Sequence, residues 1–172
     1  MDKYIFTLEV IAEMLGECLG SGNDDENGGV LAGPKSNPYL VTNIIPSSSY
    51  AERAPATYFQ NEQDVNFING ELRRLQAMGK DFIGYYHRHP SGLDRLSQGD
   101  LGTCHDILTS PNYAINNRLL MVIVTKGRAK MPIYGYNVSL TGEQAMVKSV
   151  KIKAMPGKCI KACFEGIDIN HI

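Results

Sequence analysis

Two histidines and an aspartate stand close enough along the chain to form a metal site. The motif HRHPSG begins at His87 and the motif SQGD, which ends in Asp100, begins at Ser97. Alternate residues of a β-strand point to the same face, so His87 and His89 would aim two imidazoles at one point. Two imidazoles and a carboxylate leave the fourth position of tetrahedral zinc open for a water, whose pKa the metal lowers to about 7. We interpret His87, His89 and Asp100 as candidate zinc ligands of a hydrolytic site.

Each half of this pattern has a simpler interpretation when taken alone. Two alternate histidines are often ordinary surface residues, and Ser-x-x-Asp is a common helix-capping pattern without chemistry. Together they favour a site, because Pro90 and Gly92 turn the chain and the seven residues between His89 and Ser97 allow it to return to the same rim. Ser97 would cap the next helix and Asp100 would lie one turn along it.

Other metal-dependent classes fit the sequence poorly. A zinc deaminase needs H-x-E with P-C-x-x-C, and both motifs are missing, as is the H-E-x-x-H of many metalloproteases. A cupin-type site would need a glutamate soon after the second histidine. A barrel hydrolase needs about 250 residues, whereas this chain has 172.

The elements that must position these residues can be predicted from periodicity and turn residues. Helices are predicted over 7–19, 62–78 and 97–108, and a loop over 47–57. Strands are predicted over 29–33, 39–45, 82–87, 118–125, 133–140 and 144–152. Helices interspersed with strands indicate an α/β or α+β domain with a mixed central sheet flanked by helices. We assign residues 1–155 to one domain and 156–172 to its C-terminal tail.

An upstream segment makes the pattern resemble a known family. The stretch ENGGVLAG, from Glu26 to Gly33, follows the first predicted helix. It matches the E-x-x-G-hydrophobic-L-x-G stretch of the JAMM (JAB/MPN) metalloprotease family, and H-x-H, seven residues and S-x-x-D form that family's signature. The order of predicted elements also agrees. The resemblance covers about residues 5–140 and is greatest to the compact bacterial and archaeal JAB branch.

The resemblance implies a role for each matched residue. His87, His89 and Asp100 would bind Zn²⁺. Glu26 would act as general base and then pass its proton to the leaving amine, and Ser97 would donate a hydrogen bond to the oxyanion. In this family the 47–57 region borders the substrate groove, so Arg53 is a candidate substrate contact, with a solvated arginine as the alternative.

The resemblance also implies a substrate class. We expect a zinc isopeptidase or peptidase that cleaves after the C-terminal glycine of a ubiquitin-like protein, in a conjugate or a precursor. One alternative is the trimming of a sulfur-carrier protein tail, and another is a catalytically weak scaffold domain. No long insertion separates Asp100 from Arg118, which favours a simpler substrate than a particular ubiquitin-chain linkage. Family members are often activated by a partner protein, and that option stays open here.

The composition of the chain bears on its partners, its location and the state of its cysteines. The chain has 17 Lys+Arg and 18 Asp+Glu, a formal net charge of -1, which argues against a broad nucleic-acid footprint. No apolar run approaches the about 20 residues of a membrane span, and no signal peptide is recognisable, so a cytoplasmic location is expected. Cys159 and Cys163 form a C-x-x-x-C pair that could bind metal, although reduced, unligated cysteines are the simpler interpretation. Cys104 would lie either beside the metal or in the core.

Overall fold

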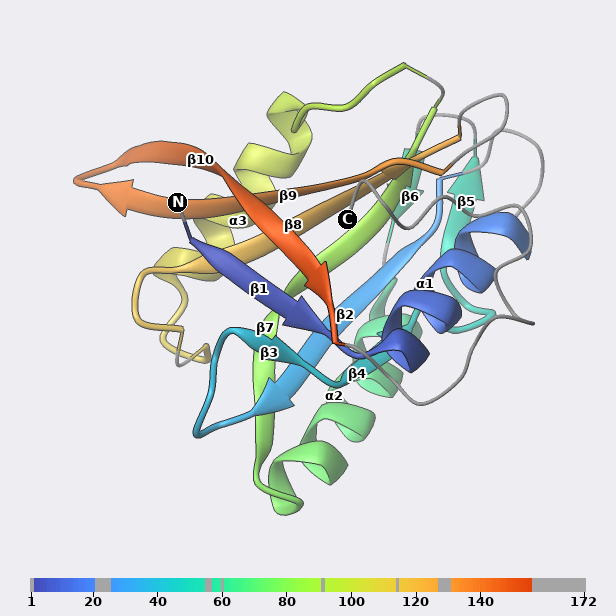
Figure 1. Ribbon diagram of the computed structural model, residues 1–172, viewed down its shortest axis with the longest axis horizontal. Coiled ribbons are helices and arrows are strands. Elements are labelled where there is room, and N and C mark those ends of the chain that lie inside the picture. The colour runs from blue at the N-terminus through green and yellow to red at the C-terminus, as the bar shows by residue number, and fades with distance from the viewer. Residues whose placement is uncertain are drawn as a thin grey trace.

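The computed structural model describes residues 2–20, 26–54, 57–59, 61–90, 92–113, 115–126 and 131–155. Its elements, in chain order, are β1 (Lys3–Phe6), α1 (Leu8–Gly20), β2 (Gly28–Pro34), β3 (Leu40–Val41), β4 (Asn43–Pro46), β5 (Glu52–Ala54), β6 (Thr57–Phe59), α2 (Glu62–Ala77), β7 (Lys80–His89), α3 (Gln98–Thr109), β8 (Leu119–Thr125), β9 (Ile133–Thr141) and β10 (Gln144–Ala154). They form an α+β domain around one large mixed sheet (Figure 1). The predicted fold class is confirmed.

The large sheet has eight strands in the order β3-β1-β10-β9-β8-β7-β2-β4. All seven residues of β8 are buried, as expected for an apolar central strand with both faces covered. Strand β7 runs parallel to β8 and antiparallel to β2. The two outermost strands, β3 and β4, are separated in the chain only by Thr42, whose N–H donates to the carbonyl of Ala32 in β2 at 3.0 Å. The sheet therefore curls until it is nearly a barrel.

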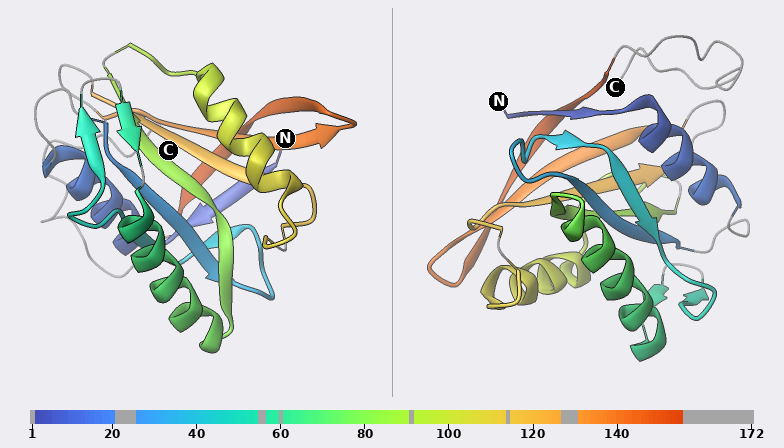
Figure 2. Two further views of the ribbon diagram at one scale, coloured as in Figure 1. Left: turned by 180° about the vertical axis from the view of Figure 1, so that it is seen from behind. Right: turned by 90° about the horizontal axis from the view of Figure 1, so that it is seen from below.

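Helices cover both faces of this curled sheet (Figure 2). On one face, α1 buries residues such as Ile11 and Met14 against Phe6, Tyr86 and Val122. On the other face, α2 and α3 bury Ile68 and Cys104 against a second apolar cluster that includes Met121 and Val138. Strands β2, β7 and β8 contribute to both clusters and are held from both sides.

The three predicted helices are present, with the caps that end them. Asn61 accepts a hydrogen bond from the N–H of Asp64 at the start of α2, and Gly79 adopts a φ of 78° after its last turn, a conformation that glycine adopts without strain. In the ranges that the structure describes, no helix combines the length and the apolar composition that a membrane crossing requires.

The single strand predicted over 39–45 is wrong. The segment forms two short strands at opposite edges of the sheet: β3 pairs with β1 and β4 pairs with β2. Because Thr42 turns the chain from one edge to the other, a continuous apolar pattern is divided between two partners.

Two further expectations also need correction. The segment predicted as a loop over 47–57 contains β5, which pairs with β6 in a small two-stranded sheet. Strand β1 was not predicted, because only four residues form it and their partner is β10, almost at the other end of the described chain. The tail 156–172, with Cys159 and Cys163, lies outside the described residues.

Candidate metal centre

The two histidines of the H-x-H motif point to the same side of β7, as predicted. Residues His87 and His89 are buried, with 8% and 4% of their surface exposed, and their Nε2 atoms are 2.7 Å apart. The Nδ1 atom of His89 is 3.0 Å from the carbonyl oxygen of Leu93. Because that carbonyl can only accept, Nδ1 carries a proton, and Nε2 is the ring nitrogen that points into the cluster.

The first turn of α3 adds Asp100 to this pair. Ser97 caps the helix: its Oγ accepts from the N–H of Asp100 at 3.1 Å, and its own N–H donates to Oδ2 of Asp100 at 2.5 Å. This capping box orients the carboxylate, whose Oδ1 lies 3.2 Å from Nε2 of His87 and whose Oδ2 lies 3.4 Å from Nε2 of His89. The capping pattern that first suggested a purely structural role therefore also aims the carboxylate.

The three residues could hold a metal ion. One ligand atom from each lies within 4.8 Å of the other two. Zn–N bonds of 2.0–2.1 Å in a tetrahedron place neighbouring ligand atoms about 3.3 Å apart, and both carboxylate-to-imidazole distances match that edge. The two Nε2 atoms need to separate by only about 0.6 Å. Side chains that fit a small cation this closely are already organised for one.

The charges in the cluster are strongly coupled. Burial alone would raise the pKa of Asp100, but the hydrogen bonds with His87 and His89 outweigh it and hold that pKa well below its usual range. For His89, burial alone would lower the pKa, but the hydrogen bond and charge of Asp100 raise it overall. The carboxylate is thus ionised and ready to bind a cation, and protons compete with the metal for His89.

The pairing of β2 with β7 places Glu26 beside the cluster. Gly28 pairs with His87, and the N–H of Arg88 donates to the carbonyl of Asn27 at 2.7 Å. Continuing this register by one residue sets Glu26 opposite His89, on the face of the sheet that carries both histidines. Glu26, which the sequence analysis named, therefore precedes His87 by 61 residues in the chain yet lies beside the cluster.

The environment of Glu26 suits a base. Partial burial raises the pKa of its carboxyl group, the two histidines lower it, Asp100 raises it again, and the net shift is upward. A carboxylate with a raised pKa accepts a proton more readily near neutral pH. Next to it, Gly28 leaves room for the cluster, because a Cβ at that position would lie 2.7 Å from Cβ of His87.

Ser97 is exposed at the rim of the site. Its bond with the N–H of Asp100 uses an oxygen lone pair of the hydroxyl, so the hydroxyl hydrogen is still available to donate. The geometry is compatible with the predicted role toward an oxyanion.

Two residues that sequence reasoning did not single out support the site from behind. Arg88, between the histidines, points to the opposite face, is 4% exposed, and donates from Nη1 to the carbonyl of Cys18 at 3.1 Å. Asn27 is 4% exposed and donates from Nδ2 to the carbonyl of Glu17 at 3.1 Å. Both bonds tie the last turn of α1 to the two strands that carry the site. The alternation of the strand could have revealed Arg88, since a charged residue there must face the core.

Two further candidate residues of the sequence analysis are Cys104 and Arg53. Cys104 is fully buried in the α2/α3 cluster, and burial raises the pKa of its thiol to about 12, so it is a core residue. The backbone of Arg53 lies in β5, paired with Tyr58, but its side chain is outside the described part of the structure.

Comparison with known proteins supports the fold and no more. No family model matches the chain, and no curated protein matches it. Among solved structures of similar fold is the solution structure of protein DSY2949 from Desulfitobacterium hafniense, with a TM-score of 0.62 and 16% sequence identity. The match covers 88% of this chain and 94% of that one. At this identity the likeness shows that the architecture is shared and leaves the chemistry to be argued from the site.

Proposed function

We propose that this protein is a zinc-dependent peptidase or isopeptidase of the JAMM type. It would hydrolyse the amide bond after the C-terminal glycine of a ubiquitin-like protein, in a conjugate or a precursor. The observation that carries the proposal is the convergence of His87, His89 and Asp100 within 4.8 Å, with the carboxyl group of Glu26, two residues before β2, close enough to feel the charges of all three.

The donor set favours zinc over other common cations. Two imidazole nitrogens and one carboxylate oxygen are typical ligands of catalytic zinc, whereas Mg²⁺ and Ca²⁺ prefer oxygen donors throughout. Zinc held by three protein ligands supplies a hydroxide nucleophile near neutral pH and polarises a carbonyl group.

The residues of the chain supply the rest of amide hydrolysis. Glu26, with its raised pKa, would accept the proton that the nucleophilic water loses and deliver it to the leaving nitrogen, which must be protonated to depart. The hydroxyl of Ser97 donates to the carbonyl oxygen as negative charge develops there. No covalent intermediate with the enzyme is required.

An extended substrate could reach the site along the edge of the sheet. Strand β4 is the outermost strand on the side of β2, and β2 begins two residues after Glu26. A glycine-ended tail could add there by β-augmentation, in which backbone hydrogen bonds give affinity and narrow surroundings select small side chains. The similarity of the motif to the JAMM signature is the reason for naming a ubiquitin-like protein.

A substrate trap tests the proposal. Glu26→Gln, carrying an affinity tag, is expressed in the source cell, its bound proteins are recovered, and zinc-loaded wild type is added. Glu13→Gln, at an exposed position of α1, is the matched control. We expect Glu26→Gln to keep one zinc and retain a small protein, which wild type releases with a new glycine C-terminus on intact-mass analysis. A partner that stays bound to both forms and is never cleaved would instead show a scaffold.

A further inference from the structure

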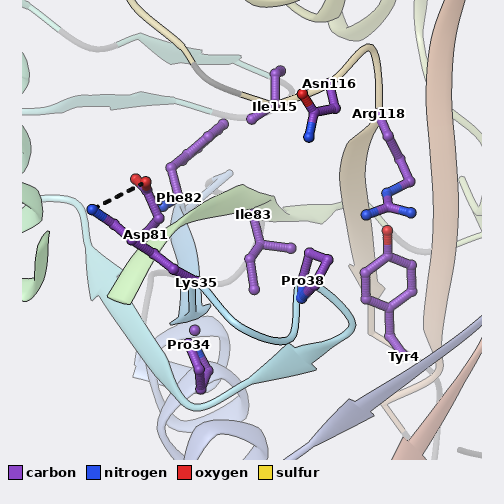
Figure 3. Close-up of a pocket in the computed structure, with 11 residues that line it drawn as sticks. Tyr4, Pro34, Lys35, Pro38, Asp81, Phe82, Ile83, Ile115, Asn116 and Arg118 are labelled. Carbon is purple, nitrogen blue, oxygen red and sulfur yellow. Dashed lines mark hydrogen bonds and ion pairs between the residues drawn. The ribbon is translucent and has the colours of Figure 1, made fainter. Parts of the chain in front are cut away.

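A cavity lies at the end of β7 that is opposite the metal cluster. It has a volume of about 280 Å³ and is lined at its centre by Ile83, Asn116 and Arg118 (Figure 3). Asp81, which also lines it, precedes His87 in β7 by six residues, or about 20 Å of extended strand. Its contents cannot touch the metal ligands, so it calls for an explanation of its own.

The cavity contains a fixed and uncompensated positive charge. The guanidinium carbon of Arg118 lies 4.3 Å from the ring centroid of Tyr39, and its Nη1 donates to the hydroxyl of Tyr39. Among the described residues, no carboxylate lies within ion-pair distance of Arg118. A guanidinium held in place by an aromatic ring keeps donors free for a planar anion, with little conformational entropy left to lose.

The nearby tyrosine does not neutralise this charge. Tyr4 is buried and donates its hydroxyl hydrogen to Oδ1 of Asn137 at 2.7 Å. Burial raises the pKa of Tyr4 to about 12, although the charge of Arg118 partly opposes that shift. The phenol is therefore neutral at physiological pH.

A turn presents a second polar group to the same space. Asn116 and Asn117 have φ angles of 44° and 52°, a left-handed conformation that asparagine adopts more readily than other non-glycine residues. Asn117 holds the turn by bonding both the N–H and the carbonyl of Leu140, at 2.7 and 2.8 Å. Asn116 has no hydrogen-bond partner in the described ranges, and Figure 3 shows its amide facing the space between Arg118 and Ile83.

The rest of the wall defines the kind of anion that fits. Ile83 and Pro38 form an apolar surface below the two polar groups, and Ile115 lies beside Asn116 (Figure 3). At the far side, Lys35 and Asp81 form an ion pair at 3.8 Å, so the side chains of the lining carry two positive charges and one negative, a net of +1. A phosphate dianion would need more donors and would be repelled by Asp81 about twice as strongly as a singly charged carboxylate, whereas a carboxylate with a short apolar substituent satisfies one guanidinium, one amide and the apolar surface.

We propose that this cavity is a binding site for a carboxylate that carries a small branched apolar group, with Arg118 and Asn116 binding the carboxylate and Ile83 with Pro38 contacting the apolar part. The ligand is either a free short-chain acid or the C-terminal carboxylate of a peptide ending in an aliphatic residue. The site goes beyond the proposed hydrolysis and does not depend on it.

The binding test uses 3-methylbutanoate as the probe and 3-methylbutanamide, which has the same shape without the charge, as its control. Both are titrated into the full chain, uniformly labelled with ¹⁵N, and followed by NMR. We expect the acid to shift the amide signals of residues 115–118 saturably, with a Kd on the order of 1 mM as befits so few ligand atoms. The amide should bind at least about 10-fold more weakly, because it cannot form the charged pair with Arg118.

Two variants of the cavity and one control variant make the test independent of folding defects. Arg118→Gln removes the charge and should abolish the saturable shift. Arg74→Gln, at an exposed position of α2, should leave the Kd unchanged. Asn116→Gly removes the amide but suits a φ of 44°, so it should raise the Kd about 3-fold to 10-fold while the melting temperature is kept or increased.

A peptide pair distinguishes the two sources of the carboxylate. A tetrapeptide ending in valine is compared with its C-terminal amide. Tighter binding of the free-ended peptide than of 3-methylbutanoate identifies a chain terminus, and the reverse order identifies a free acid. The proposal is overturned if the signals of the wild type show no saturable shift at 3-methylbutanoate concentrations well above the expected Kd. It is also overturned if the amide probe binds as tightly as the acid, or if Arg118→Gln binds the acid as tightly as the wild type does.

Discussion

The charged side chains at the two ends of β7 are arranged in opposite ways. At the carboxyl end, His87, His89 and Asp100 are in mutual contact and largely removed from water. At the amino end, Arg118 is half-exposed and stacks on an aromatic ring with no described carboxylate beside it. In the first arrangement the three side chains are hydrogen-bonded to one another, and a cation would bind by replacing the proton that they share. The second is an open cationic site that awaits an anion. One sheet thus holds a closed acid–base cluster and an open cationic pocket about 20 Å apart.

The largest expected effect is at the closed end. Asp100→Asn removes the anionic ligand and should lower zinc affinity more than about 100-fold, since loss of an outer-shell partner alone commonly costs 10-fold to 100-fold. Competition with a chromophoric chelator measures this. Asp106→Asn, on the same helix with an 88% exposed side chain, is the control. Binding of 3-methylbutanoate at the open end should not change, and a change there would mean that the two ends are coupled.

The packing of the closed end can be broken without touching a ligand. Gly28→Ala would place a Cβ 2.6 Å from the carbonyl oxygen of Tyr86 and 2.7 Å from Cβ of His87, so the strands must separate. We expect a loss of about 1–3 kcal/mol in unfolding free energy and weaker zinc binding. Gly16→Ala in α1 meets no atom within 4 Å and should stabilise by about 0.5–1 kcal/mol. Equal results in denaturant titrations of the two variants would contradict the crowding at Gly28.

The support behind the histidines is a finer test of the same end. Arg88→Met removes the bond to the carbonyl of Cys18 while keeping an apolar stem. We expect about a 10-fold loss of zinc affinity, because residues behind the ligands orient them. Arg74→Met is the exposed control. If Arg88→Met lowers only the melting temperature and leaves zinc affinity unchanged, Arg88 stabilises the fold without positioning the ligands.

The smallest expected effect concerns the open end at alkaline pH. Tyr4 has its pKa raised from 10.0 to about 12 in the folded chain, so folding favours the protonated phenol. The stabilisation is complete below about pH 10 and is lost as pH rises towards about 12. Tyr4→Phe, which cannot ionise, should show a shallower fall of melting temperature over that window than wild type. Parallel curves for the two proteins would show that burial does not shift the Tyr4 pKa.

The sequence by itself determined the parts of this protein that depend on short-range geometry. The spacing of His87 and His89 matches the two-residue period of a strand, and Ser97 with Asp100 matches a helix cap, so both could be predicted from local rules. The three helices have clear periodic patterns and end at recognisable residues, and the central strand β8 is a short continuous apolar run. The same local rules apply to the residues that would hold the metal. The candidate ligand set could therefore be predicted without knowing the fold.

Only the tertiary structure decided what depends on pairing between distant segments. The pairing of β2 with β7 brings Glu26, two residues before β2, next to the histidine cluster, and the curling of the sheet divides residues 40–46 between β3 and β4 at its two edges. The pairing of β1 with β10 and the approach of Arg118 to Tyr39 join segments more than 70 residues apart. Such contacts have no period in the sequence, because they are chosen by the burial and hydrogen bonding of the whole sheet rather than by neighbouring residues.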